Sequence, residues 1–129
     1  MESLRTPLSR ARGLGSAKHG VGHWISERIT AAALIPLVLW GVAAALRLAA
    51  ADYQSAIAWM RTSSLNPVLL VLLASISFWH MHAGLRVVIE DYIQRPLNKA
   101  ALLLGNLSVC ALAGSIAVFC ILKVALGGA

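Results

Sequence analysis

Six side chains that can do chemistry stand within thirteen residues, in and just after a strongly apolar stretch. They are His80, His82, Arg86, Glu90, Asp91 and Tyr92. A helix turns about 100° per residue, so His80 shares one stripe with Gly84 and Asp91. His82 points to nearly the opposite face, together with the residues four and eight positions after it.

His80 lies about 16 Å along the helix axis from Asp91. If Asp91 marks the membrane surface, this distance places His80 near the middle of a hydrocarbon layer about 30 Å thick. Neutral imidazole is the commonest metal ligand in proteins, and haem iron takes axial histidines. Gly84, one turn away, would let a flat macrocycle lie close to the helix. Helix geometry alone leaves open a second interpretation, in which His80 is hydrogen-bonded to a neighbouring helix.

A haem between two histidines would be incomplete in this chain. His80 and His82 point apart and cannot both bind one haem. The other two long apolar stretches contain no histidine, and His19 and His23 come before the first of them. A second axial ligand at this depth would therefore have to come from another polypeptide.

Asp91 and Tyr92 follow the second apolar stretch, at the expected depth of the membrane interface. Tyrosine is common there as an amphipathic anchor. A phenol beside a carboxylate also suits a quinone site, because the phenol can donate to a quinone carbonyl and the carboxylate can support proton supply. The residues leave both interpretations open.

The elements that carry these side chains are predicted by composition. The 129 residues are 59% hydrophobic and only 12% charged, whereas soluble domains are typically about 45–50% apolar and about 25% charged. Three stretches, at about 29–50, 67–89 and 97–126, have the roughly 20 apolar residues that a transmembrane helix needs. We therefore expect an all-α membrane protein whose three transmembrane helices run up, down and up as one domain over 29–126.

Residues 1–28 differ in kind and predict a basic N-terminal arm. They hold five basic residues and two acidic ones, namely Arg5, Arg10, Arg12, Lys18 and Arg28 against Glu2 and Glu27. The 90–99 connection adds Arg95 and Lys99, whereas the 51–66 connection has only Arg61. Because Lys and Arg near span ends favour the cytoplasmic side, the N-terminus and the second connection are predicted to be cytoplasmic. No recognition helix accompanies the arm, so we expect it to meet membrane lipid or a partner and not nucleic acid.

Two stretches carry a resemblance to a known family. The segment from His80 to Tyr92 has a histidine, a glycine four residues later, and Asp-Tyr at eleven and twelve residues later. It resembles the second-span signature of the small hydrophobic membrane anchor of succinate dehydrogenase, respiratory complex II. The segment GVGHWISERITA at 20–31 is similar to that family's first-span start. The layout of the rest of the chain, with three spans and a basic arm, agrees.

This resemblance implies a haem role for three residues. His80 would be one axial ligand of a haem b, with the other ligand coming from the larger cytochrome b anchor of the same complex. His82 is the competing candidate for the ligand. Arg28 matches an arginine that faces the haem propionates, and His23 matches a nearby surface histidine with a similar role.

The resemblance also implies a quinone role and partners. Asp91 and Tyr92 match the quinone-site pair, with Tyr92 donating to the quinone carbonyl. A flavoprotein subunit would oxidise succinate, and an iron–sulfur subunit would pass electrons to quinone at the membrane surface. The chain would not be catalytic alone. Its expected place is the bacterial or mitochondrial inner membrane, in the tricarboxylic acid cycle and respiratory chain.

Arg86 leaves alternatives open. It also fits the pattern of the homologous larger anchor, but the Ser-Pro-His start of that protein is absent and the Asp-Tyr pair favours the small anchor. A fumarate reductase anchor is a further alternative, because the sequence does not give the direction of the reaction. Arg86 could pair with Glu90, reach a propionate or meet the larger anchor. From another class, a small membrane transporter or channel component could use His82, Arg86 and Glu90 to line a polar path.

Overall fold

The computed structural model describes residues 6–13 and 20–127, and those residues are helical apart from short connections. The helices are α1 (Pro7–Arg12), α2 (Gly20–Leu48), α3 (Tyr53–Thr62), α4 (Leu65–Tyr92) and α5 (Pro96–Ala125). Three stretches, Val21–Leu48, Leu65–Tyr92 and Pro96–Ala125, are long and apolar enough to cross a membrane. The chain is therefore an all-α protein with three membrane-spanning helices, as its hydropathy predicts.

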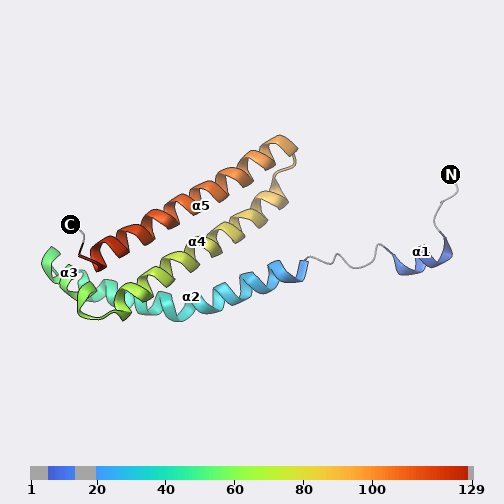
Figure 1. The fold of residues 1–129 in the computed structure, drawn as a ribbon. Coiled ribbons are helices and arrows are strands. Elements are labelled where there is room, and N and C mark those ends of the chain that lie inside the picture. The colour runs from blue at the N-terminus through green and yellow to red at the C-terminus, as the bar shows by residue number, and fades with distance from the viewer. Residues whose placement is uncertain (1–5, 14–19, 128–129) are drawn as a thin grey trace.

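Helix α4 lies at the centre of the arrangement. It packs against α2 on one side and against α5 on the other (Figure 1). Gly41 of α2 permits a close approach to α4, because a Cβ added there would lie only 2.9 Å from Leu73 Cδ2. Small residues of this kind let helices pack closely in membranes.

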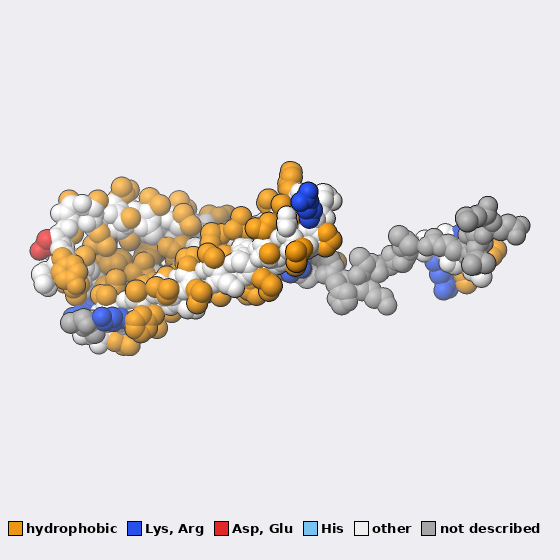
Figure 2. All heavy atoms as spheres, turned by 90° about the horizontal axis from the view of Figure 1, so that it is seen from above, with side chains coloured by type: hydrophobic (Ala, Val, Ile, Leu, Met, Phe, Trp, Pro, Cys, Tyr) orange, Lys and Arg blue, Asp and Glu red, His pale blue; other side chains and the backbone are white. Residues whose placement is uncertain are grey.

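Very little of the described chain is buried. The buried side chains are those of Ala44, Ala83 and Cys110, and none of them is polar or charged. Hydrophobic side chains cover the middle of the helices on the face shown in Figure 2, and Lys and Arg gather toward the ends. In water such an exposed apolar surface would be unfavourable, whereas lipid tails or a partner helix can cover it at no cost in free energy.

The start of α5 follows the usual preference for proline in the first turn of a helix. Pro96 opens α5 at its first turn, where its missing N–H would have no partner in any case.

Helix α2 begins at Gly20, so 20–28 of the predicted arm is helical and carries His23 and Arg28. In the rest of the arm, Arg10 and Arg12 lie on α1, whereas Arg5, Lys18 and His19 lie outside the described residues.

Helix α3 occupies the 51–66 connection between the first two spans. Asp52 caps it by accepting a hydrogen bond from the Ser55 N–H at 3.1 Å. Hydrogen bonding from the Ser55 hydroxyl first, and from this N–H second, lowers the pKa of Asp52. Arg61 Nε donates to the Val124 carbonyl oxygen at the end of α5 at 2.9 Å. Trp59 stacks on Trp40 of α2 with ring centroids 6.1 Å apart. Helix α3 therefore ties α2 and α5 together at this end.

Candidate functional site

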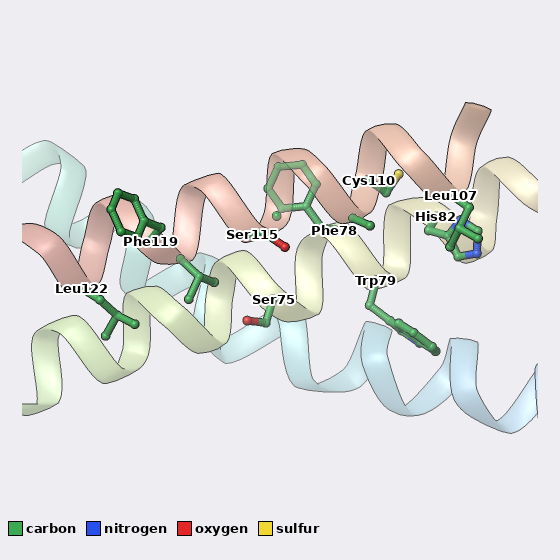
Figure 3. A pocket seen from close by; sticks show the side chains of 12 residues that line it. Ser75, Phe78, Trp79, His82, Leu107, Cys110, Ser115, Phe119 and Leu122 are labelled. Atoms are coloured by element: carbon green, nitrogen blue, oxygen red, sulfur yellow. The ribbon is translucent and has the colours of Figure 1, made fainter. Parts of the chain in front are cut away.

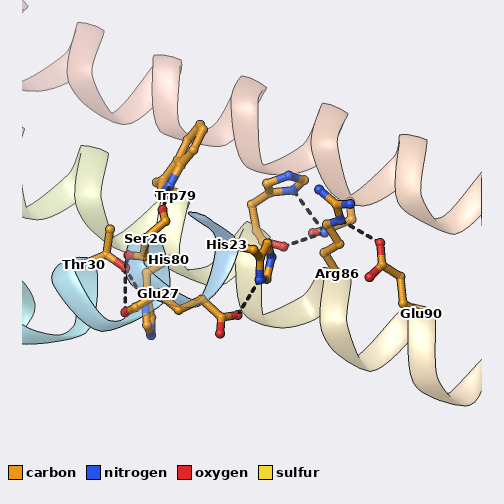
Figure 4. A network of polar contacts seen from close by, with 10 residues as sticks. His23, Ser26, Glu27, Thr30, Trp79, His80, Arg86 and Glu90 are labelled. Atoms are coloured by element: carbon orange, nitrogen blue, oxygen red, sulfur yellow. Dashed lines mark hydrogen bonds and ion pairs between the residues drawn. The ribbon is translucent and has the colours of Figure 1, made fainter. Parts of the chain in front are cut away.

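His80 lies near the middle of α4 and faces α2. Its ring is half-buried, and its Nδ1 atom lies 2.9 Å from the Thr30 hydroxyl oxygen on α2 (Figure 4). One residue earlier, Trp79 Nε1 donates to Ser26 Oγ at 3.4 Å. Two consecutive residues of α4 thus contact two α2 residues that are one turn apart. The sequence had left open a haem ligand or a hydrogen-bonded histidine, and the structure shows the hydrogen bond and leaves ligation open.

His82 faces the other neighbour, α5. Asn106 Nδ2 lies 3.0 Å from the His82 carbonyl oxygen and 3.1 Å from its Nδ1. The carbonyl can only accept, so the amide must present its nitrogen there. Asn106 Oδ1 in turn accepts from Cys110 Sγ at 3.3 Å, which agrees with that orientation.

The asparagine contact decides the protonation of His82. Because the amide nitrogen is a donor, Nδ1 of His82 must be the acceptor, and the ring proton sits on Nε2. A protonated ring nitrogen has no lone pair for a metal. His82 is therefore poorly suited to bind iron through Nε2 while this contact is made.

Gly84 offers an open surface one turn after His80. A Cβ added to Gly84 would meet no heavy atom within 4 Å. The backbone there is exposed, so a flat ligand could lie directly on it. His80 and Gly84 thus fit the edge of a macrocycle, although no three His, Cys, Asp or Glu side chains in the described ranges cluster as a metal site.

His23 and Arg28 do not share a face of α2. His23 is seven residues before Thr30 and falls on nearly the same stripe, whereas Arg28 is about 200° from Thr30. His23 Nδ1 lies 3.9 Å from Glu27 Oε1. The Arg28 guanidinium sits over the Trp24 ring, 5.4 Å from its centroid. The structure therefore brings His23 toward the α4 side and leaves Arg28 turned away from it.

Asp91 and Tyr92 are at the end of α4, and both are exposed, Tyr92 by 78%. Neither side chain makes a hydrogen bond within the described part of the chain. Just before them, Arg86 Nε donates to Glu90 Oε1 at 2.7 Å, which is the first of the three roles considered for Arg86. Lys99 Nζ donates to the Glu90 carbonyl oxygen at 2.7 Å and ties the α4–α5 connection to this end.

A cavity of about 530 Å³ opens between α4 and α5 (Figure 3). His82, Cys110 and aromatic side chains such as Phe78 and Phe119 line it. His80 does not line this cavity. The two histidines therefore face separate spaces.

Sequence reasoning missed the partners of both histidines. Thr30 and Asn106 are polar residues within predicted spans, and membrane helices use such side chains to form hydrogen bonds with neighbouring helices. Their polarity could therefore have marked them as partners. Which histidine each would meet could not be read from spacing, since the partners lie on different helices.

The fold and these contacts define a multi-pass membrane protein with a polar centre on its middle helix. Residues 2–122 match the family described as succinate dehydrogenase/fumarate reductase transmembrane subunit, and the chain belongs to this family. Within this family the chain is a membrane-anchor subunit.

Curated relatives agree. The chain is 33% identical to the succinate dehydrogenase hydrophobic membrane anchor subunit of Rickettsia conorii over 90 residues, which cover 70% of this chain and 71% of that protein. The anchor subunits of Rickettsia bellii and Rickettsia typhi are 36% and 30% identical over the same shares. No solved structure gives a significant match.

Proposed function

We propose that this chain is the small anchor of a succinate:quinone oxidoreductase, and that His80 supplies one axial ligand to a haem b. The observation that carries the ligand assignment is the pairing of His80, half-buried near the middle of α4, with the open backbone at Gly84. His82 is the weaker candidate, because Asn106 donates to its Nδ1 and so leaves the ring proton on Nε2. Haem, when bound, supplies a one-electron redox centre inside the membrane.

The other axial ligand comes from the larger cytochrome b anchor, since α2 and α5 contain no further histidine at this depth. His23 and Arg28 are the proposed contacts of the propionates. They would approach from different sides of α2, because they lie on different stripes of that helix. His23 shares the stripe of Thr30, so it is the better placed of the two.

Asp91 and Tyr92 form part of the quinone site. Their side chains are exposed at the end of α4 and make no hydrogen bond with any residue that the structure describes. A phenol donor and a carboxylate are therefore available to a bound quinone. Tyr92 would donate to the quinone carbonyl, and Asp91 would take part in proton supply. The electrons would come from succinate through the flavoprotein and iron–sulfur subunits.

The polar contacts favour the anchor over the transporter alternative. In that alternative, His82, Arg86 and Glu90 could line a polar path. His82 is instead bonded to α5, and Arg86 and Glu90 pair with each other.

Affinity purification of the tagged chain in mild detergent tests the proposal. Mass spectrometry should find a flavoprotein, an iron–sulfur protein and a second small membrane protein. The reduced-minus-oxidised spectrum of the same sample should show the α-band of a b-type haem. A complete complex without that band would refute the haem role and leave the anchor role intact.

A further inference from the structure

The Thr30 hydroxyl has three polar neighbours but only one proton to give. Its oxygen lies 2.9 Å from the Ser26 carbonyl oxygen, 3.1 Å from the Glu27 carbonyl oxygen and 2.9 Å from His80 Nδ1. Both carbonyls can only accept. If the hydroxyl proton pointed to His80, its lone pairs would face two carbonyl oxygens, which is electrostatically unfavourable. The proton therefore points to the carbonyls.

This arrangement makes His80 the donor to Thr30. Neutral imidazole carries one N–H, so a proton on Nδ1 leaves the lone pair on Nε2. The outcome is opposite to that at His82, where Asn106 donates to Nδ1. Two histidines that are two residues apart are thus held in opposite tautomers by the helices on either side.

We infer that Thr30 is a positioning residue for His80, which holds the imidazole ring in one orientation with Nε2 free to bind iron. The inference rests on the proposed haem role of His80. Ligating histidines generally donate their other ring N–H to an oxygen acceptor, which fixes the tautomer and raises the basicity of the ligand. Here the acceptor is the Thr30 hydroxyl, whose own proton is donated to the backbone carbonyl oxygens of Ser26 and Glu27 on α2.

A neighbouring contact supports the placement of the ring. Ser26, one turn before Thr30, accepts from Trp79, one residue before His80. The two contacts together fix the rotation of α4 relative to α2 at this level. The ring of His80 is therefore located by the packing of two helices as well as by its own rotamer.

Removing the hydroxyl should change the haem without removing its ligand. Loss of such a partner typically weakens metal binding about 10–100-fold. Thr30→Val should therefore lower haem retention during purification. It should also shift the highest g value of the oxidised haem in electron paramagnetic resonance spectra and raise its midpoint potential, because a less basic imidazole stabilises ferric iron less.

The test compares variants in the complete complex, with haem content, resonance spectrum and midpoint potential as readouts. Thr30→Val and Thr30→Ala remove the hydroxyl with and without the β-branch, and Thr30→Ser keeps it and should restore the parent spectrum. Thr62→Val is the matched control, since Thr62 makes the same bond to the carbonyl four residues earlier, at 2.7 Å from Ala58 O, but lies exposed on α3. If Thr30→Val does not assemble, the spectrum of Thr30→Ala decides.

Parent values in the hydroxyl-free variants would overturn the inference, as would equal shifts in Thr30→Ser and Thr30→Val. His80→Ala separates this failure from failure of the proposed function. If His80→Ala keeps the haem spectrum, His80 is not the ligand. If it loses the spectrum while Thr30→Val and Thr30→Ala are unchanged, the ligand stands and only the role of Thr30 falls.

Discussion

His80 and His82 are two residues apart on α4, yet their side chains bond to opposite neighbours. His80 Nδ1 lies 2.9 Å from Thr30 Oγ1 on α2, and His82 Nδ1 lies 3.1 Å from Asn106 Nδ2 on α5. A separation of two residues turns a helix by about 200°, so the two rings must diverge. The His80 ring therefore contacts α2, and the His82 ring contacts α5.

The first prediction concerns the haem ligand. His80→Ala should remove or strongly perturb the low-spin haem b spectrum, because it removes the imidazole on the Gly84 side of α4. His82→Ala should leave the spectrum nearly intact, since it removes only the ring contacts to Asn106 and Trp79. Optical spectra at matched complex content measure both. A normal spectrum in His80→Ala together with loss in His82→Ala would reverse the assignment.

The second prediction concerns Gly84. Gly84→Leu should lower haem content, because the side chain would occupy the open space where a flat ligand could lie on the backbone. The added Cβ itself has room in this chain, since it meets nothing within 4 Å. Gly105→Leu on α5 is the control, because Gly105 is equally open. Equal haem content in the two variants would argue against a macrocycle at Gly84.

The third prediction concerns Tyr92 and quinone. Tyr92→Phe keeps the ring at the membrane interface but deletes the hydroxyl donor. Losing one hydrogen bond that strengthens as charge develops on the quinone oxygen should cost about 10²-fold in the rate of quinone reduction. Succinate oxidation with an artificial acceptor that draws from the soluble subunits should survive, as should haem content, because His80 is about 18 Å away along the helix.

Two further variants sharpen this test. Asp91→Asn should show the same selective loss if the carboxylate supports proton transfer. Tyr53→Phe is the control, since Tyr53 is comparably exposed, by 74%, but precedes α4 at the other end of the molecule. If Tyr92 serves only as an interfacial anchor, Tyr92→Phe will reduce quinone as fast as the parent.

The fourth prediction concerns orientation. A reporter inserted after Gln94, between α4 and α5, should report the cytoplasmic side, and one inserted after Ser63, between α3 and α4, should report the opposite side. The reason is the excess of Lys and Arg in the N-terminal arm and the 90–99 connection. Paired phosphatase and fluorescent-protein fusions measure both positions. A cytoplasmic signal after Ser63 would invert the topology and move Tyr92 away from the dehydrogenase side.

Hydropathy alone was enough to predict the three spans, because a helix that crosses lipid must be apolar along its whole length. Helical periodicity was also enough to place His80, Gly84 and Asp91 on one stripe, since angles within one helix follow from spacing. The start of α2 was harder, because residues 20–28 are too polar for a hydropathy window but continue the helix without a break.

Spacing within a helix says nothing about its rotation against its neighbours, and that rotation comes only from packing. The tertiary structure decided that His80 faces Thr30 and His82 faces Asn106, and it turned Arg28 away from the α4 side of α2. It also filled the first connection with α3, whose Arg61 bonds across 63 residues to Val124. The sequence by itself therefore determined which side chains share a helix face. Only the contact of α4 with α2 and α5 decided which partner each side chain met, because those partners are brought together by helix packing and not by the chain's local geometry.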